Sequence, residues 1–185
     1  MSSNHNLNDL LHWKDLISGD EAAFSSLFKK YYNSLYNFGK LYTSDSSLIS
    51  DSIQDLFMDL WEKRRKLSSD INVKPYIYGA FRNKLFKKLK QRSGLKSFYE
   101  NKLEIGYDLS IEEQLINSER KNQKILKVHG ALNKLPPKQK EVVFLKFYKG
   151  FSNQQISEIL GINHQSVKNH IYRSSLFFKK ELNDF

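Results

Sequence analysis

The chain has 185 residues, no cysteine and a formal net charge of +10. The lack of cysteine excludes disulfides and thiolate metal sites, and the excess of lysine and arginine favours an anionic partner such as nucleic acid. No apolar run approaches the roughly 20 residues that a membrane span requires, and the amino terminus lacks the features of a signal peptide. We therefore expect a cytoplasmic protein with no membrane insertion.

Helical periodicity predicts three helices in the first half of the chain, and strand patterns are almost absent. The first helix begins after Asp20, the second carries an apolar face from Ile49 to Trp61, and the third follows Pro75. Apolar residues recur at helical spacing in all three: Phe24, Phe28, Tyr31, Leu35, Phe38 and Tyr42, then Ile49, Ile53, Phe57, Leu60 and Trp61, then Ile77, Phe81, Leu85 and Leu89. Three such stripes can close one helical core over residues 9–92.

The second and third of these helices carry opposite charge. From Asp45 to Glu62 the sequence has five acids and no base, whereas from Lys74 to Lys96 it has eight bases and no acid. Cations interleaved with aromatic residues are typical of a surface that follows phosphates and stacks exposed bases. Tyr78 and Phe86 are better explained as core residues, and Tyr76 fits either role. The acidic face fits a basic protein partner or a plain solvated surface.

After residue 92 the helical periodicity weakens, and glycines and serines interrupt the sequence. We expect residues 93–120 to form a flexible acidic linker and residues 121–185 to form a second small helical domain. In that second domain Pro137 suits the first turn of a helix.

The segment ISEILGINHQSVKNHI, Ile156–Ile171, contains two short helical patterns separated by a glycine. Ser152 and Gln155, three residues apart, have the spacing of a capping box for the first helix. Gly161 can end that helix with a positive φ, and Asn163 can cap the second. This pattern is typical of a helix-turn-helix, whose second helix lies in the major groove of DNA. The polar residues left to contact bases and phosphates are Gln165, Ser166, Lys168, Asn169, Tyr172 and Arg173. An αα-hairpin with a solvated polar face is the alternative. The predicted fold class is all-α: two small helical domains joined by a flexible linker, the C-terminal one containing a helix-turn-helix.

Four segments follow one another along the chain: SGDEAAFSSLFKKYYNSLYNFGKLY, ISDSIQDLFMDLWEKR, KPYIYGAFRNKLFKKLKQR and LNKLPPKQKEVVFLKFYKGFSNQQISEILGINHQSVKNHIYRSSLFFKKEL. Together they resemble bacterial RNA polymerase sigma factors of the extracytoplasmic-function type. The resemblance covers nearly the whole chain apart from the first few residues and the linker. It implies a region 2-like domain over residues 9–92, a region 4-like domain over residues 121–185, and a transcription initiation factor that directs core RNA polymerase to promoters.

The resemblance also implies a role for each segment. SDSIQDLFMDLW corresponds to the segment that docks on core polymerase, which implies a core-binding face made of Asp51, Gln54, Asp55, Asp59 and Glu62. The third helix corresponds to the reader of the melted minus-10 element, and the preceding loop, Leu67 to Val73, to the loop that captures a flipped base. The implied minus-10 contacts are Ser68, Ser69, Asp70, Tyr76, Arg82, Asn83, Lys84, Lys87 and Lys88. The helix-turn-helix corresponds to the reader of the minus-35 duplex, with implied contacts by Ser152, Asn163, Gln165, Ser166, Lys168, Asn169, Tyr172 and Arg173.

The partners that the resemblance implies are core RNA polymerase, duplex and single-stranded promoter DNA, and an anti-sigma factor; we expect no cofactor and no metal. A stand-alone helix-turn-helix repressor or activator that binds duplex DNA would explain the C-terminal half equally well. The first half argues against it, because no alternating strand–helix receiver pattern is present. An enzyme is disfavoured, since none of the five histidines has metal-ligand spacing beside a carboxylate and there is no phosphate-binding glycine loop.

Overall fold

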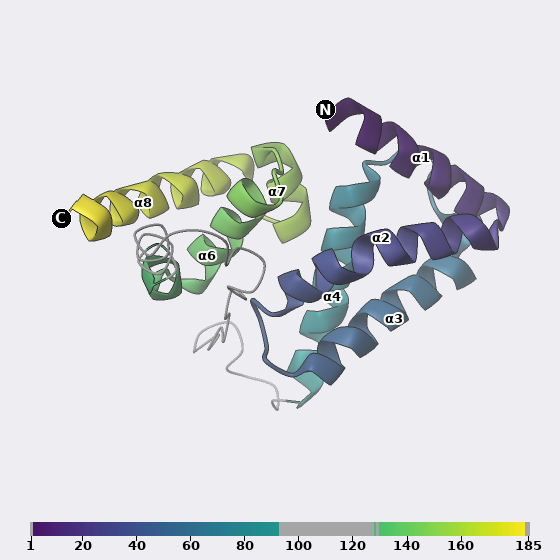
Figure 1. The fold of residues 1–185 in the computed structure, drawn as a ribbon, viewed down its shortest axis with the longest axis horizontal. Coiled ribbons are helices and arrows are strands. Elements are labelled where there is room, and N and C mark those ends of the chain that lie inside the picture. The colour runs from purple at the N-terminus through teal and green to yellow at the C-terminus, as the bar shows by residue number, and fades with distance from the viewer. Residues whose placement is uncertain (1, 93–127, 129, 184–185) are drawn as a thin grey trace, which may run out of the picture. The chain divides into compact units, whose positions relative to one another are not determined.

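The computed structural model describes residues 2–92, 128 and 130–183, and every regular element within these ranges is a helix (Figure 1). The chain divides into two compact units, Met1–Glu104 and Ile105–Phe185. The all-α fold class is therefore confirmed. The linker predicted for residues 93–120 lies outside the described residues.

The first unit contains four α-helices: α1 (Ser2–Ser18), α2 (Glu21–Gly39), α3 (Ser46–Glu62) and α4 (Val73–Arg92). A short 3-10 turn, η1 (Arg64–Lys66), follows α3. The helices α2 and α3 run side by side, α4 crosses them, and α1 packs against both α2 and α4 (Figure 1). Asp20 begins α2 as its N-cap, where its carboxylate accepts hydrogen bonds from the backbone N–H of Ala22 at 2.7 Å and Ala23 at 3.1 Å.

The three predicted apolar stripes form the core of this unit. The fully buried residues include Leu35 and Phe38 on α2, Ile49 and Ile53 on α3, and Ile77, Phe81 and Leu85 on α4. The centre of the α2 stripe is shifted from the prediction: Ala23 and Leu27 are buried, while Phe24 and Phe28 are only half-buried at the edge. Both of these phenylalanine rings contact the ring of Phe57 on α3. The shift is one position along the helix and is confined to the first part of the stripe, because Tyr31, Leu35 and Phe38 are buried as predicted.

The sequence predicted no helix before Asp20, so α1 is an addition to the prediction. Its buried residues are Asp9, Trp13 and Leu16. The Asp9 carboxylate is 3% exposed and accepts hydrogen bonds from Lys30 Nζ at 2.5 Å and from the Tyr31 hydroxyl at 2.8 Å. The buried charge of Asp9 is tolerated because it has these two partners. An aspartate on the buried face also interrupts the apolar stripe of the helix. Hydrophobic periodicity therefore gave no signal here.

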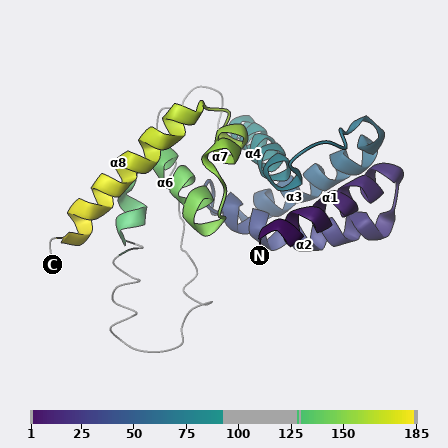
Figure 2. The same cartoon turned by 90° about the horizontal axis from the view of Figure 1, so that it is seen from above.

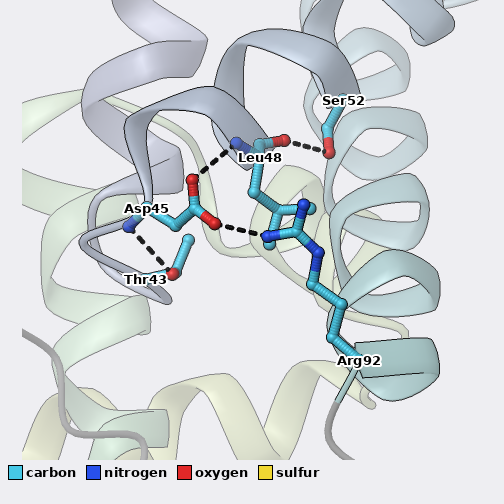
Figure 3. Close-up of polar contacts among 5 residues, drawn as sticks. All are labelled: Thr43, Asp45, Leu48, Ser52 and Arg92. Atoms are coloured by element: carbon cyan, nitrogen blue, oxygen red, sulfur yellow. Dashed lines mark hydrogen bonds and ion pairs between the residues drawn. The ribbon is translucent and has the colours of Figure 1, made fainter.

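Figure 3 shows how Asp45 joins the start of α3 to the end of α4. The Asp45 carboxylate caps α3 by accepting a hydrogen bond from the backbone N–H of Leu48 at 2.9 Å, and it also forms an ion pair with Arg92. The Leu48 hydrogen bond, followed by Arg92, holds the pKa of Asp45 below its usual range. The backbone N–H of Asp45 itself donates to Thr43 Oγ1 at 3.1 Å. One side chain thus serves as a helix cap and as a tie between two helices.

The second unit is described at residue 128 and over residues 130–183. Residues 130–134 are helical and are followed by α6 (Pro137–Val143), the π-helical turn η3 (Phe144–Tyr148), α7 (Asn153–Leu160) and α8 (His164–Asn183). Pro137 opens α6, as predicted. Leu132, Leu135 and Val143 form a buried cluster against which Phe177 and Phe178 of α8 pack. Figure 2 shows α7 beside the N-terminal end of α8.

Candidate DNA and polymerase interfaces

The helix-turn-helix has the geometry that its sequence predicts. Ser152 and Gln155 form a reciprocal capping box, in which Ser152 Oγ accepts from the Gln155 N–H at 3.2 Å and Gln155 Oε1 accepts from the Ser152 N–H at 2.9 Å. Gly161 ends α7 with φ 63°, a left-handed conformation that glycine adopts at little cost. Asn163 Oδ1 then accepts from the Ser166 N–H at 2.7 Å. Ser152 and Asn163, both predicted to contact DNA, therefore use their side-chain oxygens as helix caps.

The remaining predicted minus-35 residues lie together on the outward face of α8. Val167 is completely buried, and Ile171 and Phe178 are half-buried. Outward lie Gln165, Lys168, Asn169, Tyr172 and Arg173, all exposed, with Ser166 partly exposed. Gln165 Nε2 donates to Asn169 Oδ1 at 3.1 Å, so the two amides are held one helical turn apart. Amides and cations at this spacing can bond to base edges and phosphates along a groove.

His170 lies on the same helix but turns toward α6. Its Nδ1 is buried and has no hydrogen-bond partner in the structure. Burial, with Lys138 and Arg173 nearby, lowers the pKa of His170, and Glu141 acts in the opposite direction. The imidazole is therefore neutral at neutral pH and serves the packing of α8 on α6.

The basic helix α4 presents a mixed surface of cations and aromatic rings. Asn83 and Lys87 are exposed, and the Arg82 guanidinium lies over the Phe86 ring, 4.4 Å from its centroid. Tyr76 is 40% exposed. Tyr78 is completely buried and shares a hydrogen bond of 2.6 Å with Ser34 Oγ, and burial raises the pKa of Tyr78 to about 12. Tyr78 is thus confirmed as a core residue, and of the two tyrosines Tyr76 is the one available to a ligand.

The loop before α4 projects its side chains outward and is held from behind. Ser68, Ser69 and Asp70 are all exposed. The indole N–H of Trp13, on α1, donates to the backbone oxygen of Ser68 at 2.9 Å. The Trp13 ring also meets the Tyr76 ring edge-on, with centroids 5.4 Å apart. Trp13 was missing from the predicted site, because only the three-dimensional packing of α1 brings it to this loop.

Four residues that the sequence placed on two separate surfaces are in fact ion-paired with one another. Lys84 Nζ lies 2.7 Å from Asp59 Oδ2, and Lys88 Nζ lies 2.7 Å from Asp55 Oδ2. The Lys84 hydrogen bond is the largest cause that lowers the pKa of Asp59. Part of the acidic face therefore lies against the basic helix at the edge where α3 and α4 meet. The packing of α3 on α4 brings opposite charges together there.

The outer part of the acidic face points to solvent. Asp51, Gln54 and Glu62 are exposed, and Met58 among them is 58% exposed. An apolar side chain surrounded by carboxylates is suited to a basic protein surface with a hydrophobic centre. Met58 was not predicted, although its spacing of four from Gln54 and from Glu62 could have identified it.

Within the described ranges, histidine and carboxylate side chains form no group of three that could hold a metal ion. Nor does any helix in those ranges have the length and apolar character needed to cross a bilayer.

Comparison with known families matches both units. The model described as "Sigma-70 region 2" matches residues 27–94, and the one described as "Sigma-70, region 4" matches residues 125–176; together they cover more than half of the chain. The chain is 22% identical to the RNA polymerase sigma factor NccH of Alcaligenes xylosoxydans xylosoxydans over 159 residues, which is 84% of each chain. It is 23% identical to the RNA polymerase sigma factor SigZ of Bacillus subtilis over 149 residues, which is 80% of each chain.

Solved structures show the same fold. CnrH, in complex with the cytosolic domain of CnrY, is 17% identical with a TM-score of 0.65, covering 96% of this chain and 98% of CnrH. The sigma factor RpoE of Bartonella quintana, in complex with the anti-sigma factor NepR, is 18% identical with a TM-score of 0.59, covering 86% of this chain and 96% of RpoE. With a region 2 match on the first unit, a region 4 match on the second and sigma factors as relatives matched over 80% or more of their length, the chain belongs to the RNA polymerase sigma factors of the extracytoplasmic-function type.

Proposed function

We propose that this protein directs core RNA polymerase to promoters by reading a minus-35 duplex with α8 and a melted minus-10 element with α4 and the loop before it. The observation that carries the proposal is the pairing, in one chain, of a helix-turn-helix with an exposed polar face and a separate basic helix beside an exposed aromatic ring. A stand-alone regulator would have no use for the second surface. The protein performs no bond-making step in this role.

At the minus-35 duplex, the proposal gives different tasks to the amides and the cations of α8. Gln165 and Asn169 have the bidentate geometry that suits adenine, whereas Lys168 and Arg173 suit guanine or phosphate. The caps formed by Ser152 and Asn163 fix the angle between α7 and α8, which sets how α8 enters the groove. We therefore assign to these two residues an orienting role in addition to any contact with DNA.

At the minus-10 element, the exposed side chains of α4 suit single-stranded DNA. Lys87 and Asn83 can follow the phosphates, Tyr76 can stack on an unpaired base, and the loop carrying Ser68 to Asp70 can enclose a flipped one. Lys84 and Lys88 add to the positive electrostatic potential of this surface although they are ion-paired with Asp59 and Asp55 of α3.

The proposed polymerase-binding face consists of Asp51, Gln54 and Glu62 with Met58 at its centre, and Asp55 and Asp59 at its edge. Core polymerase is the expected basic partner, which places the protein in the cytoplasm. The similar protein CnrH was solved with the cytosolic domain of CnrY, and the similar sigma factor RpoE was solved with the anti-sigma factor NepR. By the likeness to RpoE we expect an anti-sigma factor here too.

Run-off transcription on a promoter library, with core polymerase from the same bacterium, tests the proposal. Transcripts that depend on the protein and share a two-part motif are the expected result. If no transcript appears and the protein alone binds a specific duplex, the stand-alone regulator is the better description.

A further inference from the structure

The helix α1 precedes the residues matched by the region 2 family model, which begin at residue 27, yet it contacts the proposed minus-10 site. Its residue Trp13 is completely buried. The indole N–H donates to the Ser68 backbone oxygen at 2.9 Å, and the ring meets that of Tyr76 at 5.4 Å between centroids and 68° between planes. One side chain therefore contacts both the proposed base-capturing loop and the proposed base-stacking ring.

The hydrogen bond is made to the main chain of the loop. Between η1 and α4 the chain has no regular secondary structure, and the side chains of Ser68, Ser69 and Asp70 are exposed. A loop of this kind loses conformational entropy when it closes on a ligand, and each contact that fixes it beforehand reduces that loss. Because the indole bonds to a carbonyl, the loop side chains stay available to DNA.

Trp13 can act as a fixed point because α1 is anchored elsewhere. Asp9, one turn earlier on the same helix, is bonded to Lys30 and Tyr31 of α2. Leu16, three residues after Trp13, is completely buried. The Asp9 anchor lies on α2 and involves neither the loop nor Tyr76, so the α1–α2 contact helps to set the position of the indole.

We propose that Trp13 is a positioning residue for minus-10 recognition, which holds the Ser68 loop and the Tyr76 ring in the arrangement that receives an unstacked base. The inference rests on the proposed function of these two elements and adds a residue that has no DNA contact of its own. It makes α1 part of the minus-10 reader.

The test uses the holoenzyme and a promoter found in the transcription experiment above, with 2-aminopurine placed at each minus-10 position in turn. Trp13→Phe keeps an aromatic ring and removes the N–H. We expect this variant to weaken the preference for the captured base over other bases at that position by about 3- to 10-fold, which corresponds to the net free energy of one hydrogen bond. Affinity for core polymerase, affinity for the minus-35 duplex and the salt slope are expected to stay unchanged.

Tyr32→Phe is the matched control, because it removes a hydrogen bond between α2 and α3, from the Tyr32 hydroxyl to Ser50 Oγ, without touching α1 or the loop. It should leave base discrimination intact. Trp13→Tyr, a second variant without the indole N–H, should reproduce the pattern of Trp13→Phe whatever its stability in urea. A uniform loss at all minus-10 positions, an equal defect in Tyr32→Phe, or unchanged discrimination in both Trp13 variants would overturn the inference. If the wild-type holoenzyme transcribes the promoter but gives no 2-aminopurine signal at any minus-10 position, the inference is overturned while the proposed function stands. If the transcription experiment yields no promoter, the proposed function fails and the inference fails with it.

Discussion

Three lysines of α4 share a charge but differ in their surroundings. Lys87 is exposed, whereas Lys84 and Lys88 are ion-paired with carboxylates of α3. A cation that is already paired releases fewer DNA counterions when it meets a phosphate. We therefore expect Lys87→Ala to lower the salt slope of holoenzyme binding to single-stranded minus-10 DNA by about 0.7, and Lys84→Ala or Lys88→Ala to lower it by less.

The measurement is the affinity across a series of salt concentrations. Lys29→Ala, which removes an exposed lysine of α2 outside the proposed site, is the control and should leave the slope unchanged. Asp59→Asn should raise the slope, because it frees Lys84. Equal decreases for all three α4 lysines would show that the ion pairs with α3 do not survive in the complex.

His170 gives a prediction of pH dependence. Its folded-state pKa is lowered by burial and by Lys138 and Arg173, so between the folded value and the unfolded value of about 6.5 the unfolded chain binds the proton more tightly. Stability should therefore fall as the pH drops below about 6.5. In urea unfolding, the free energy of unfolding of His170→Gln should fall less between about pH 7.5 and pH 5.5 than that of the unchanged protein. These two pH values lie about one unit on either side of the unfolded-state pKa. His164→Gln, at an exposed histidine of the same helix, controls for the removal of one imidazole.

At the scale of the helices, Gly39 sets how closely α2 approaches its neighbours. A Cβ at this position would lie 2.7 Å from Ile49 Cγ2 and 3.1 Å from Phe81 Cζ, both in the core. Gly39→Ala should lower the free energy of unfolding of the first unit by about 1–3 kcal/mol, although alanine is the better helix former. Urea unfolding followed by circular dichroism measures it.

Gly130 is the matched control for Gly39. It is also helical, but a Cβ there meets nothing within 4 Å. Gly130→Ala should be neutral or stabilise the chain by up to about 1 kcal/mol. If both variants lose stability, the cause is the loss of glycine's backbone freedom at each position. The close packing of Gly39 against Ile49 and Phe81 would then not explain the result.

The sequence predicted those features of the helices that depend on local spacing. The apolar stripes of α2, α3 and α4, the capping box at Ser152 and the left-handed Gly161 all follow from residues a few positions apart. It could not predict α1, whose buried face includes Asp9, nor the pairing of Lys84 with Asp59, which depends on the register between two helices. For the same reason Trp13 was absent from the predicted site. Contacts between elements, and not the elements themselves, were the missing information.

At the scale of the whole molecule, the two units give one chain two separate DNA-binding surfaces. The helix-turn-helix face of α8 belongs to one unit and the basic surface of α4 to the other. When two weak sites are covalently joined, the second binding event takes place at an effective concentration in the millimolar range. Neither surface then has to bind its promoter element tightly, which is consistent with the small number of exposed polar residues that each presents.

Cutting the chain between the two units tests this argument. A protease site inserted within residues 93–120, the predicted linker, should leave transcription intact until the protease is added. After cleavage, transcription at low protein concentration should fall by about 10²- to 10⁴-fold and recover in part as the concentration is raised. The control carries the same protease site after Phe185 and should be insensitive to cleavage. Full activity after complete cleavage would mean that polymerase holds each unit independently, so that the connection contributes nothing to promoter affinity and each DNA-binding surface must be stronger than its few contacts suggest.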